Sequence, residues 1–258
     1  MWELGGKSCQ SRLLIGTAGY PSLEILHQAV VASKAEIVTV SLKREDPTNR
    51  CGQRFWDIIN SLSSLVLPNT AGCRQAKEAI YIAEMAREIF STHWIKLEIS
   101  GDDMLLQPDP FELLKAARTL IEMGFEVFPF CTEDYIVCQK LYDLGCHILM
   151  PWGAPIGSGK GLLNPFGLKL LRTRLPDATL IVDAGIGSPM HAMQALMLGY
   201  DAVLVNSAIA QALDPVAMAS AFSLAVESGY VAHQAGIMPE TDFAHASTPL
   251  EQTYFGAR

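Results

Sequence analysis

Short apolar runs alternate with longer amphipathic stretches along most of the chain. Eight runs have the length and composition of β-strands, at residues 12–16, 36–40, 65–68, 94–99, 126–130, 147–150, 179–183 and 202–206. Most of them consist largely of aliphatic residues, which is typical of parallel strands that are buried on both faces. Strands that alternate with helices predict a parallel sheet whose faces are covered by crossover helices.

Between these runs the spacing of apolar residues is helical, at 74–90, 110–123, 133–144, 189–198 and 215–228. Proline begins three of these segments and glycine follows three, which are signals for helix starts and ends. Eight strands alternating with helices predict an α/β fold, a (β/α)8 TIM barrel in a single domain over residues 1–236. A doubly wound open sheet is the alternative, but the strand count and the lack of a GxGxxG motif disfavour it.

The rest of the chain loses this periodicity. Residues 237–258 read IMPETDFAHASTPLEQTYFGAR and are expected to form a C-terminal arm or a partly disordered segment. The polar segment 43–54, KREDPTNRCGQR, is expected to be a long loop at the C-terminal end of the barrel strands, either an active-site loop or a solvated one.

Composition narrows the possible functions. Half of the 258 residues are hydrophobic and 18% are charged, which suits one large core. The net charge is −8 and Lys and Arg do not cluster, so we expect neither nucleic-acid nor membrane binding. The six cysteines form no CxxC pair and the six histidines have no tight ligand spacing, so no metal site is expected. Without a secretory signal or a membrane-spanning run, a cytoplasmic location with reduced thiols is expected.

The strand WIKLE (94–98) carries two charges where a buried strand should have none. Trp94, Lys96 and Glu98 share one face, and the aliphatic residues 95, 97 and 99 share the other. If the aliphatic face meets the helices, both charges point into the barrel, where they must be paired or used. Two interpretations are open. One is a structural ion pair; the other is an amine whose pKa is lowered by burial so that it can attack a carbonyl, with Glu98 transferring protons.

Three loops rich in small residues follow the last three predicted strands. They read PWGAPIGSGKG (151–161), DAGIGSP (183–189) and NSAIA (206–210). Barrels often bind phosphate with such loops, through backbone N–H groups and helix N-termini. Flexible turns are the alternative. Asp183 ends the seventh predicted strand and should face the same rim as WIKLE, unless it serves as a helix N-cap.

Several long motifs can be compared with known families: LPNTAGC (67–73), WIKLEI (94–99), MPWGAPIGSGKG (150–161), VDAGIG (182–187) and NSAIAQALDPVAMA (206–219). Together they resemble one family, the bacterial thiazole synthases (ThiG family) of thiamine biosynthesis. The resemblance runs from about Gly5 to Gly236. It implies a (β/α)8 barrel that makes the thiazole phosphate moiety of thiamine. The implied substrates are 1-deoxy-D-xylulose 5-phosphate, dehydroglycine and the thiocarboxylate of a ubiquitin-like sulfur carrier.

The resemblance also implies roles for single residues. Lys96 would form an imine with the sugar ketone, and Glu98 and Asp183 would transfer protons. The implied contacts to the sugar phosphate are Gly157, Ala184, Gly185, Asn206 and Ser207. The chain departs from the family where it reads GTAGY (16–20) in place of GTGKY, and where Ser207 replaces a commoner threonine.

The implied partners are a ThiS-like sulfur-carrier protein, an enzyme that supplies dehydroglycine, and further copies of the chain in a homotetramer; no cofactor is expected. The tail of the carrier must reach the barrel mouth, which predicts a docking surface near the C-terminal rim. A class I aldolase-like sugar-phosphate lyase that uses the same lysine is the alternative enzyme. A non-catalytic sugar-phosphate sensor is a third possibility, and in that case the charge of Lys96 alone would suffice.

Overall fold

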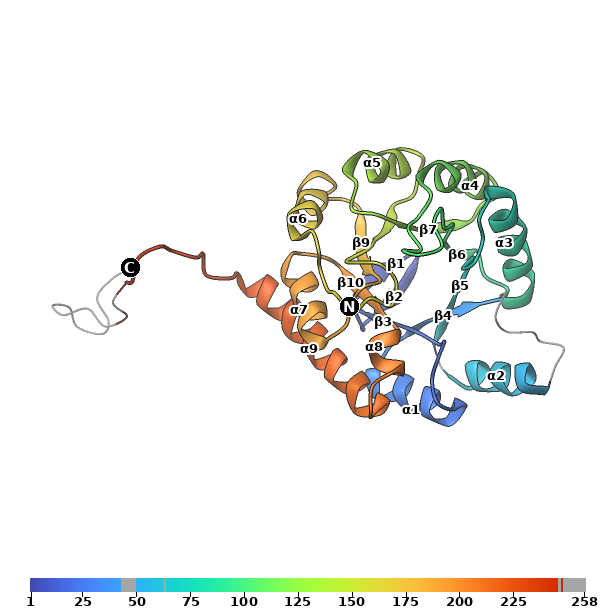
Figure 1. Ribbon diagram of the computed structural model, residues 1–258, viewed down its shortest axis with the longest axis horizontal. Coiled ribbons are helices and arrows are strands. Elements are labelled where there is room, and N and C mark those ends of the chain that lie inside the picture. The colour runs from blue at the N-terminus through green and yellow to red at the C-terminus, as the bar shows by residue number, and fades with distance from the viewer. Residues whose placement is uncertain (43–49, 63, 246, 248–258) are drawn as a thin grey trace.

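The computed structural model describes residues 1–42, 50–62, 64–245 and 247, and its centre is a closed barrel of eight parallel strands (Figure 1). Around the barrel the strand order is β10-β3-β4-β5-β6-β7-β8-β9. The barrel strands are β3 (Leu13–Gly16), β4 (Ile37–Ser41), β5 (Leu65–Asn69), β6 (Trp94–Leu97), β7 (Glu126–Cys131), β8 (Ile148–Pro151), β9 (Thr179–Asp183) and β10 (Ala202–Val205). The predicted (β/α)8 barrel is confirmed, with every predicted strand present.

Helices form an outer ring around the barrel (Figure 1). They are α1 (Leu23–Ser33), α2 (Arg50–Ser61), α3 (Ala76–Phe90), α4 (Pro110–Glu122), α5 (Tyr135–Asp143), α6 (Pro165–Arg174), α7 (Pro189–Met197), α8 (Ser207–Ala210) and α9 (Pro215–Ala235). The predicted proline starts are confirmed, because α4, α7 and α9 each begin at a proline. The predicted glycine ends are confirmed as well, because Gly124, Gly145 and Gly199 have positive φ angles after α4, α5 and α7. Helix α9 is longer than predicted. Its Gly229 lies against α7, where a Cβ atom would stand 2.5 Å from the carbonyl oxygen of Met193.

The predicted long loop at 43–54 is wrong in its second part. Residues 50–54 begin α2, and residues 43–49 lie outside the described residues. After α9 the described residues from 236 to 245 form neither helix nor strand, and the chain leads away from the barrel (Figure 1). The domain boundary at residue 236 stays a prediction. Within the described part of the chain, no helix combines the length and hydropathy needed to cross a membrane.

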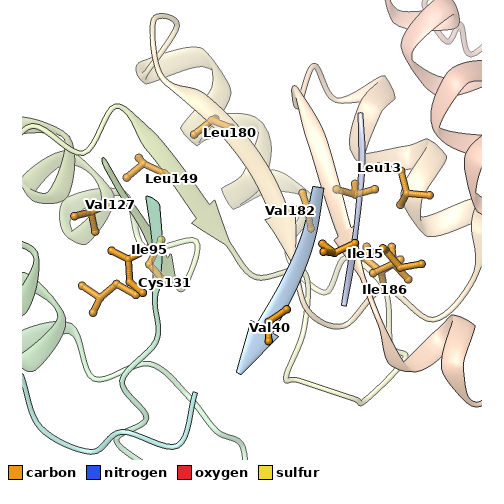
Figure 2. Packing of buried hydrophobic residues seen from close by; sticks show 14 of the residues in the cluster. Leu13, Ile15, Val40, Ile95, Val127, Cys131, Leu149, Leu180, Val182 and Ile186 are labelled. Carbon is orange, nitrogen blue, oxygen red and sulfur yellow. The ribbon is translucent and has the colours of Figure 1, made fainter. Parts of the chain in front are cut away.

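The strands separate two hydrophobic clusters. Side chains on their outer face pack against the helices, as Figure 2 shows for Leu13, Ile15, Ile95, Val127, Leu149, Leu180 and Val182. Side chains on the inner face fill the barrel as a second cluster that includes Leu14, Leu67, Trp94, Phe128, Met150 and Ile181. Strand β6 therefore has the predicted orientation: its aliphatic residues face the helices, and Trp94 faces the interior.

A short antiparallel hairpin closes one end of the barrel. Its strands β1 (Trp2–Leu4) and β2 (Lys7–Cys9) place Leu4 and Cys9 in the inner cluster. The indole Nε1 of Trp94 donates a hydrogen bond to the carbonyl oxygen of Gly5, at 3.1 Å. Three-residue strands have too little periodicity to be recognised from sequence. With this end filled by apolar side chains, the polar inner residues gather at the opposite, C-terminal end.

Candidate active site

A cavity of about 360 Å³ opens at the C-terminal end of the barrel strands. Its lining includes every site residue predicted from the sequence: Lys96, Glu98, Gly157, Asp183, Ala184, Gly185, Asn206 and Ser207. Four strands and the loops that follow them supply these residues. The structure therefore places the predicted nucleophile, the acidic residues and the small-residue loops around one space.

Two carboxylates surround the buried amine in this cavity. The Nζ atom of Lys96 lies 2.5 Å from Oδ2 of Asp183 and 3.8 Å from Oε2 of Glu98. The three side chains are only 7%, 4% and 11% exposed. Asp183 is not a helix N-cap, because Ser188 occupies that position before α7. The lysine of WIKLE therefore has its shortest ion pair with a residue from a distant strand, and its neighbour Glu98 is the second partner.

The electrostatics of Lys96 differ from the expectation of a lowered pKa. Burial alone lowers the pKa of an amine, but the charges and hydrogen bonds of Asp183 and Glu98 outweigh it, so the pKa of Lys96 is raised. The ring of Phe130, 5.4 Å from Nζ, further favours the cation. The resting lysine is therefore an ammonium ion, and it must lose a proton before it can act as a nucleophile.

Thr70, a buried residue that the sequence patterns did not identify, holds the backbone of Glu98. Strand β6 ends at Leu97, so Glu98 lies just beyond it. The Thr70 hydroxyl accepts a hydrogen bond from the Glu98 N–H and donates one to the Glu98 carbonyl oxygen, both at 2.8 Å. This pair of bonds continues the β6 direction by one residue and keeps Glu98 beside Lys96.

Several glycines of the predicted phosphate loops allow these loops to pack closely against each other. A Cβ atom at Gly185, which has a φ of +77°, would stand 2.4 Å from Ala154. A Cβ atom at Gly187 would stand 2.3 Å from the carbonyl oxygen of Gly159. The loops after β8 and β9 thus pack backbone against backbone. This packing is a role for Gly185 and Gly187 that the loop patterns did not predict.

Gly157 differs from these glycines, because its Cα faces open space. The nearest atom to a Cβ there would be Oγ of Ser207, at 3.9 Å. Among the described residues, the backbone N–H groups of Gly157, Gly185 and Ser207 donate to no other protein group. Three N–H donors from three loops that line the same cavity suit an anion such as a phosphate group.

Asn206, also predicted, lies over strand β3. A Cβ atom at Gly16 would stand 2.6 Å from the Cβ atom of Asn206, so only glycine leaves room for this side chain. The Oδ1 atom of Asn206 is buried and has no hydrogen-bond partner in the described part of the chain. A buried amide oxygen in this state is available to a ligand hydroxyl group or N–H group.

Further lining residues were missed from the sequence: Gly16, Thr17, Thr39, Ser41 and Asn69. Gly16, Thr39, Ser41 and Asn69 share the alternation of the inner residues Leu14, Ile37 and Leu67, which marks the inner face, and Thr17 directly follows β3. Their height relative to Lys96 depends on strand register. Among the residues that the structure describes, no group of three or more His, Cys, Asp or Glu side chains is placed to hold a metal ion.

Comparisons with known proteins agree with this geometry. Residues 3–249 match the family model of "Thiazole biosynthesis protein ThiG", which extends past the C-terminal limit of the resemblance seen in the motifs. A thiazole synthase from Bradyrhizobium sp. is 59% identical over 255 residues, covering 99% of this chain and 98% of that protein. One from Coxiella burnetii is 54% identical over 250 residues, covering 97% and 96%.

Solved structures show the same architecture. The Amycolatopsis orientalis BexX/CysO complex contains a chain that superposes with a TM-score of 0.83 at 28% identity, covering 93% of this chain and 98% of that one. A thiamine phosphate pyrophosphorylase from Pyrococcus furiosus has a TM-score of 0.59 at 14% identity, covering 84% and 96%, and shows the fold alone. On the match to the family model and the identities to its relatives, the chain belongs to the ThiG family of thiazole synthases in thiamine biosynthesis.

Proposed function

We propose that this barrel forms the thiazole phosphate moiety of thiamine by way of an imine between Lys96 and the ketone of 1-deoxy-D-xylulose 5-phosphate. The other substrates would be dehydroglycine and a carrier-protein thiocarboxylate. The observation that carries the proposal is a buried lysine between two carboxylates, in one cavity with three backbone N–H groups that have no partner among the described residues. A ketose phosphate fits both features, because its phosphate suits the N–H groups and its ketone suits the amine.

The resting ion pair determines how the first step proceeds. Asp183, 2.5 Å from Nζ, accepts the proton that Lys96 must lose. The neutral amine then bonds to the ketone carbon, and the ketone oxygen leaves as water after protonation. The imine makes the neighbouring C–H acidic, so a carboxylate can remove that proton. The carboxylates of Asp183 and Glu98 are both within reach of Nζ, so the site has two groups for these transfers.

The imine can be tested by trapping. The protein is incubated with 1-deoxy-D-xylulose 5-phosphate, reduced with borohydride, and digested for mass spectrometry. We expect one adduct, on Lys96, and none in the variant Lys96→Arg, because a guanidinium ion stays protonated. Folded wild-type protein that binds the sugar phosphate without forming an adduct would exclude the imine. Formation of thiazole phosphate after addition of the carrier and dehydroglycine separates the synthase from an aldolase-like lyase.

The proposed sulfur carrier needs a docking surface beside the cavity. Helices α4, α5, α6 and α7 each present an exposed apolar residue at their second position, all at the C-terminal end of the barrel. These four residues, called the rim residues, are Phe111, Ile136, Phe166 and Met190, with exposed fractions from 55% to 81%. We propose that the body of the carrier rests on them while its C-terminal tail enters the cavity. Their place at the mouth of the cavity is what supports this docking surface, because a carrier tail that enters the cavity brings the body of the carrier to this rim.

The rim residues can be separated from the catalytic site by experiment. The double variant Phe111→Asp/Phe166→Asp should form the Lys96 adduct normally, yet lose sulfur transfer from the carrier by roughly tenfold or more, as hot-spot aromatic residues do. The control is Val231→Asp, at an apolar residue that is 56% exposed and lies near the N-terminal ends of β3 and β4. Normal sulfur transfer by the rim variant, or an equal loss in the control, would refute this docking surface.

Two further partners stay predictions from the sequence: the enzyme that supplies dehydroglycine, and the other copies of the chain in a homotetramer. The cytoplasmic location also stays a prediction. The BexX/CysO complex supports the carrier proposal in one respect, since a chain that superposes on this barrel with a TM-score of 0.83 was solved in complex with a second protein.

A further inference from the structure

Two neutral polar side chains stand beside Lys96 on the cavity wall. Ser41 ends β4 and Asn69 ends β5, and both line the cavity. Strand register pairs Ser41 with Asn69, and Asn69 with Lys96. Residues paired in register on neighbouring parallel strands point to the same face. The three side chains therefore form a row across β4, β5 and β6 that faces the inside of the barrel.

Polar atoms of Asn69 and Ser41 lack hydrogen-bond partners among the described residues. The Oδ1 atom of Asn69 accepts a hydrogen bond from the backbone N–H of Ala71, at 3.2 Å. Because that oxygen must face Ala71, the Nδ2 donors are directed elsewhere, and among the described residues they have no acceptor. The Oγ atom of Ser41 is buried and has no hydrogen-bond partner there either. Leaving polar groups unpaired next to a cavity is unfavourable unless a ligand completes their bonds.

The position of the row indicates which part of a ligand it contacts. The unpartnered backbone N–H groups belong to loops after β8, β9 and β10, whereas Ser41 and Asn69 extend from β6 in the other direction around the barrel. Neither Ser41 nor Asn69 is charged, so these two side chains suit a hydroxyl or carbonyl oxygen and not a phosphate. We infer that Asn69 and Ser41 bind the oxygen on the carbon next to the imine carbon, and so select ketose phosphates that carry a hydroxyl group there. This inference rests on the proposed function.

The donor chemistry of Asn69 also suits the step after imine formation. Loss of the proton from the neighbouring carbon to a carboxylate converts the imine into an enamine. Reprotonation at the former imine carbon and loss of the hydroxyl proton leave a ketone on the neighbouring carbon, with no oxidant required. A hydroxyl oxygen and a carbonyl oxygen both accept a hydrogen bond from Nδ2, so Asn69 can hold this oxygen throughout the step.

The test compares two ketones with the same phosphate. One is 1-deoxy-D-xylulose 5-phosphate, and the other is its analogue without the hydroxyl group next to the ketone. The concentration dependence of the borohydride-trapped Lys96 adduct gives an apparent affinity for each. We expect the wild-type protein to favour the hydroxylated ketone by roughly tenfold or more, as sites built to bind a hydroxyl group do. In Asn69→Ala this preference should fall to about twofold or less, mainly through weaker binding of the hydroxylated ketone.

Two further variants make the result specific. Asn69→Asp keeps the acceptor for Ala71 but replaces the N–H donors with a second acceptor oxygen, which can still bind a hydroxyl group but not a carbonyl oxygen. The effect of its charge on Lys96 is common to both ketones. Ser41→Ala should lower the preference for the hydroxylated ketone, whereas the control Ser188→Ala should leave it unchanged. Ser188 also has a buried hydroxyl without a partner among the described residues but does not line the cavity. Equal losses for both ketones in the Asn69 variants would show a structural role and overturn the inference. No adduct with either ketone in wild-type protein would instead refute the proposed function.

Discussion

Removing the charge of Lys96 should destabilise the barrel, because it takes the nearest cation away from the buried carboxylate of Asp183. In Lys96→Met the side chain keeps a similar length and loses the ammonium group. Breaking a buried pair by removing one partner costs about 3–5 kcal/mol in the free energy of unfolding. The Coulomb attraction varies as the inverse of distance, so 2.5 Å to Asp183 against 3.8 Å to Glu98 makes the Glu98 attraction about two-thirds as strong. Asp183→Asn should therefore destabilise more than Glu98→Gln.

Urea denaturation of the single variants and of the double variant Lys96→Met/Asp183→Asn measures the change in the free energy of unfolding. The double variant should lose clearly less stability than the sum of the two single changes, because the second change removes a charge that the first left unpaired. The folded-state pKa of Lys96 is raised, so the stabilisation is fully present below its ordinary pKa and is lost only as the pH rises through the folded-state value. The destabilisation in Lys96→Met should then be equal at pH 6 and pH 8. Single-variant losses below about 1 kcal/mol, or losses that simply add, would refute a tightly coupled pair.

The remaining predictions concern the nucleophile Lys96, the loop after β9 and the end of the barrel that the β1–β2 hairpin closes. Because the pKa of Lys96 is raised, the rate of imine formation in wild-type protein should still rise between pH 7 and pH 9; a rate that is flat over this range would contradict an ammonium resting state. Gly185→Ala should lower the free energy of unfolding by about 2 kcal/mol or more, as measured by denaturation, because of its positive φ and a clash with Ala154. The same variant should bind sugar phosphate poorly, as measured by calorimetry. Trp94→Phe should lower the free energy of unfolding by about 1 kcal/mol, because it removes the hydrogen bond to Gly5, and imine formation should be unchanged. A variant as stable as the wild-type protein would show that this bond contributes nothing to stability.

Local patterns were enough to define the barrel and its faces. The alternation within WIKLEI predicted which residues of β6 face the helices, because successive side chains on a strand point in opposite directions whatever the surroundings. Helix starts at Pro110, Pro189 and Pro215 were likewise predicted, since a proline ring favours the first turn of a helix without tertiary contacts. The segment 50–54 was predicted wrongly as loop, because polar residues with a glycine also fit the first turn of an exposed helix.

The chemical state of the site depended on tertiary structure. Lys96 and Asp183 are 87 positions apart, and only barrel closure brings them to 2.5 Å, which raises the pKa that burial alone would lower. The row of Ser41 and Asn69 beside Lys96 depends on strand register, which local sequence does not encode. Local sequence patterns thus account for the strands, their faces and the residue types available for catalysis. The structure decided which of them meet, because contacts between distant strands depend on how the whole barrel closes.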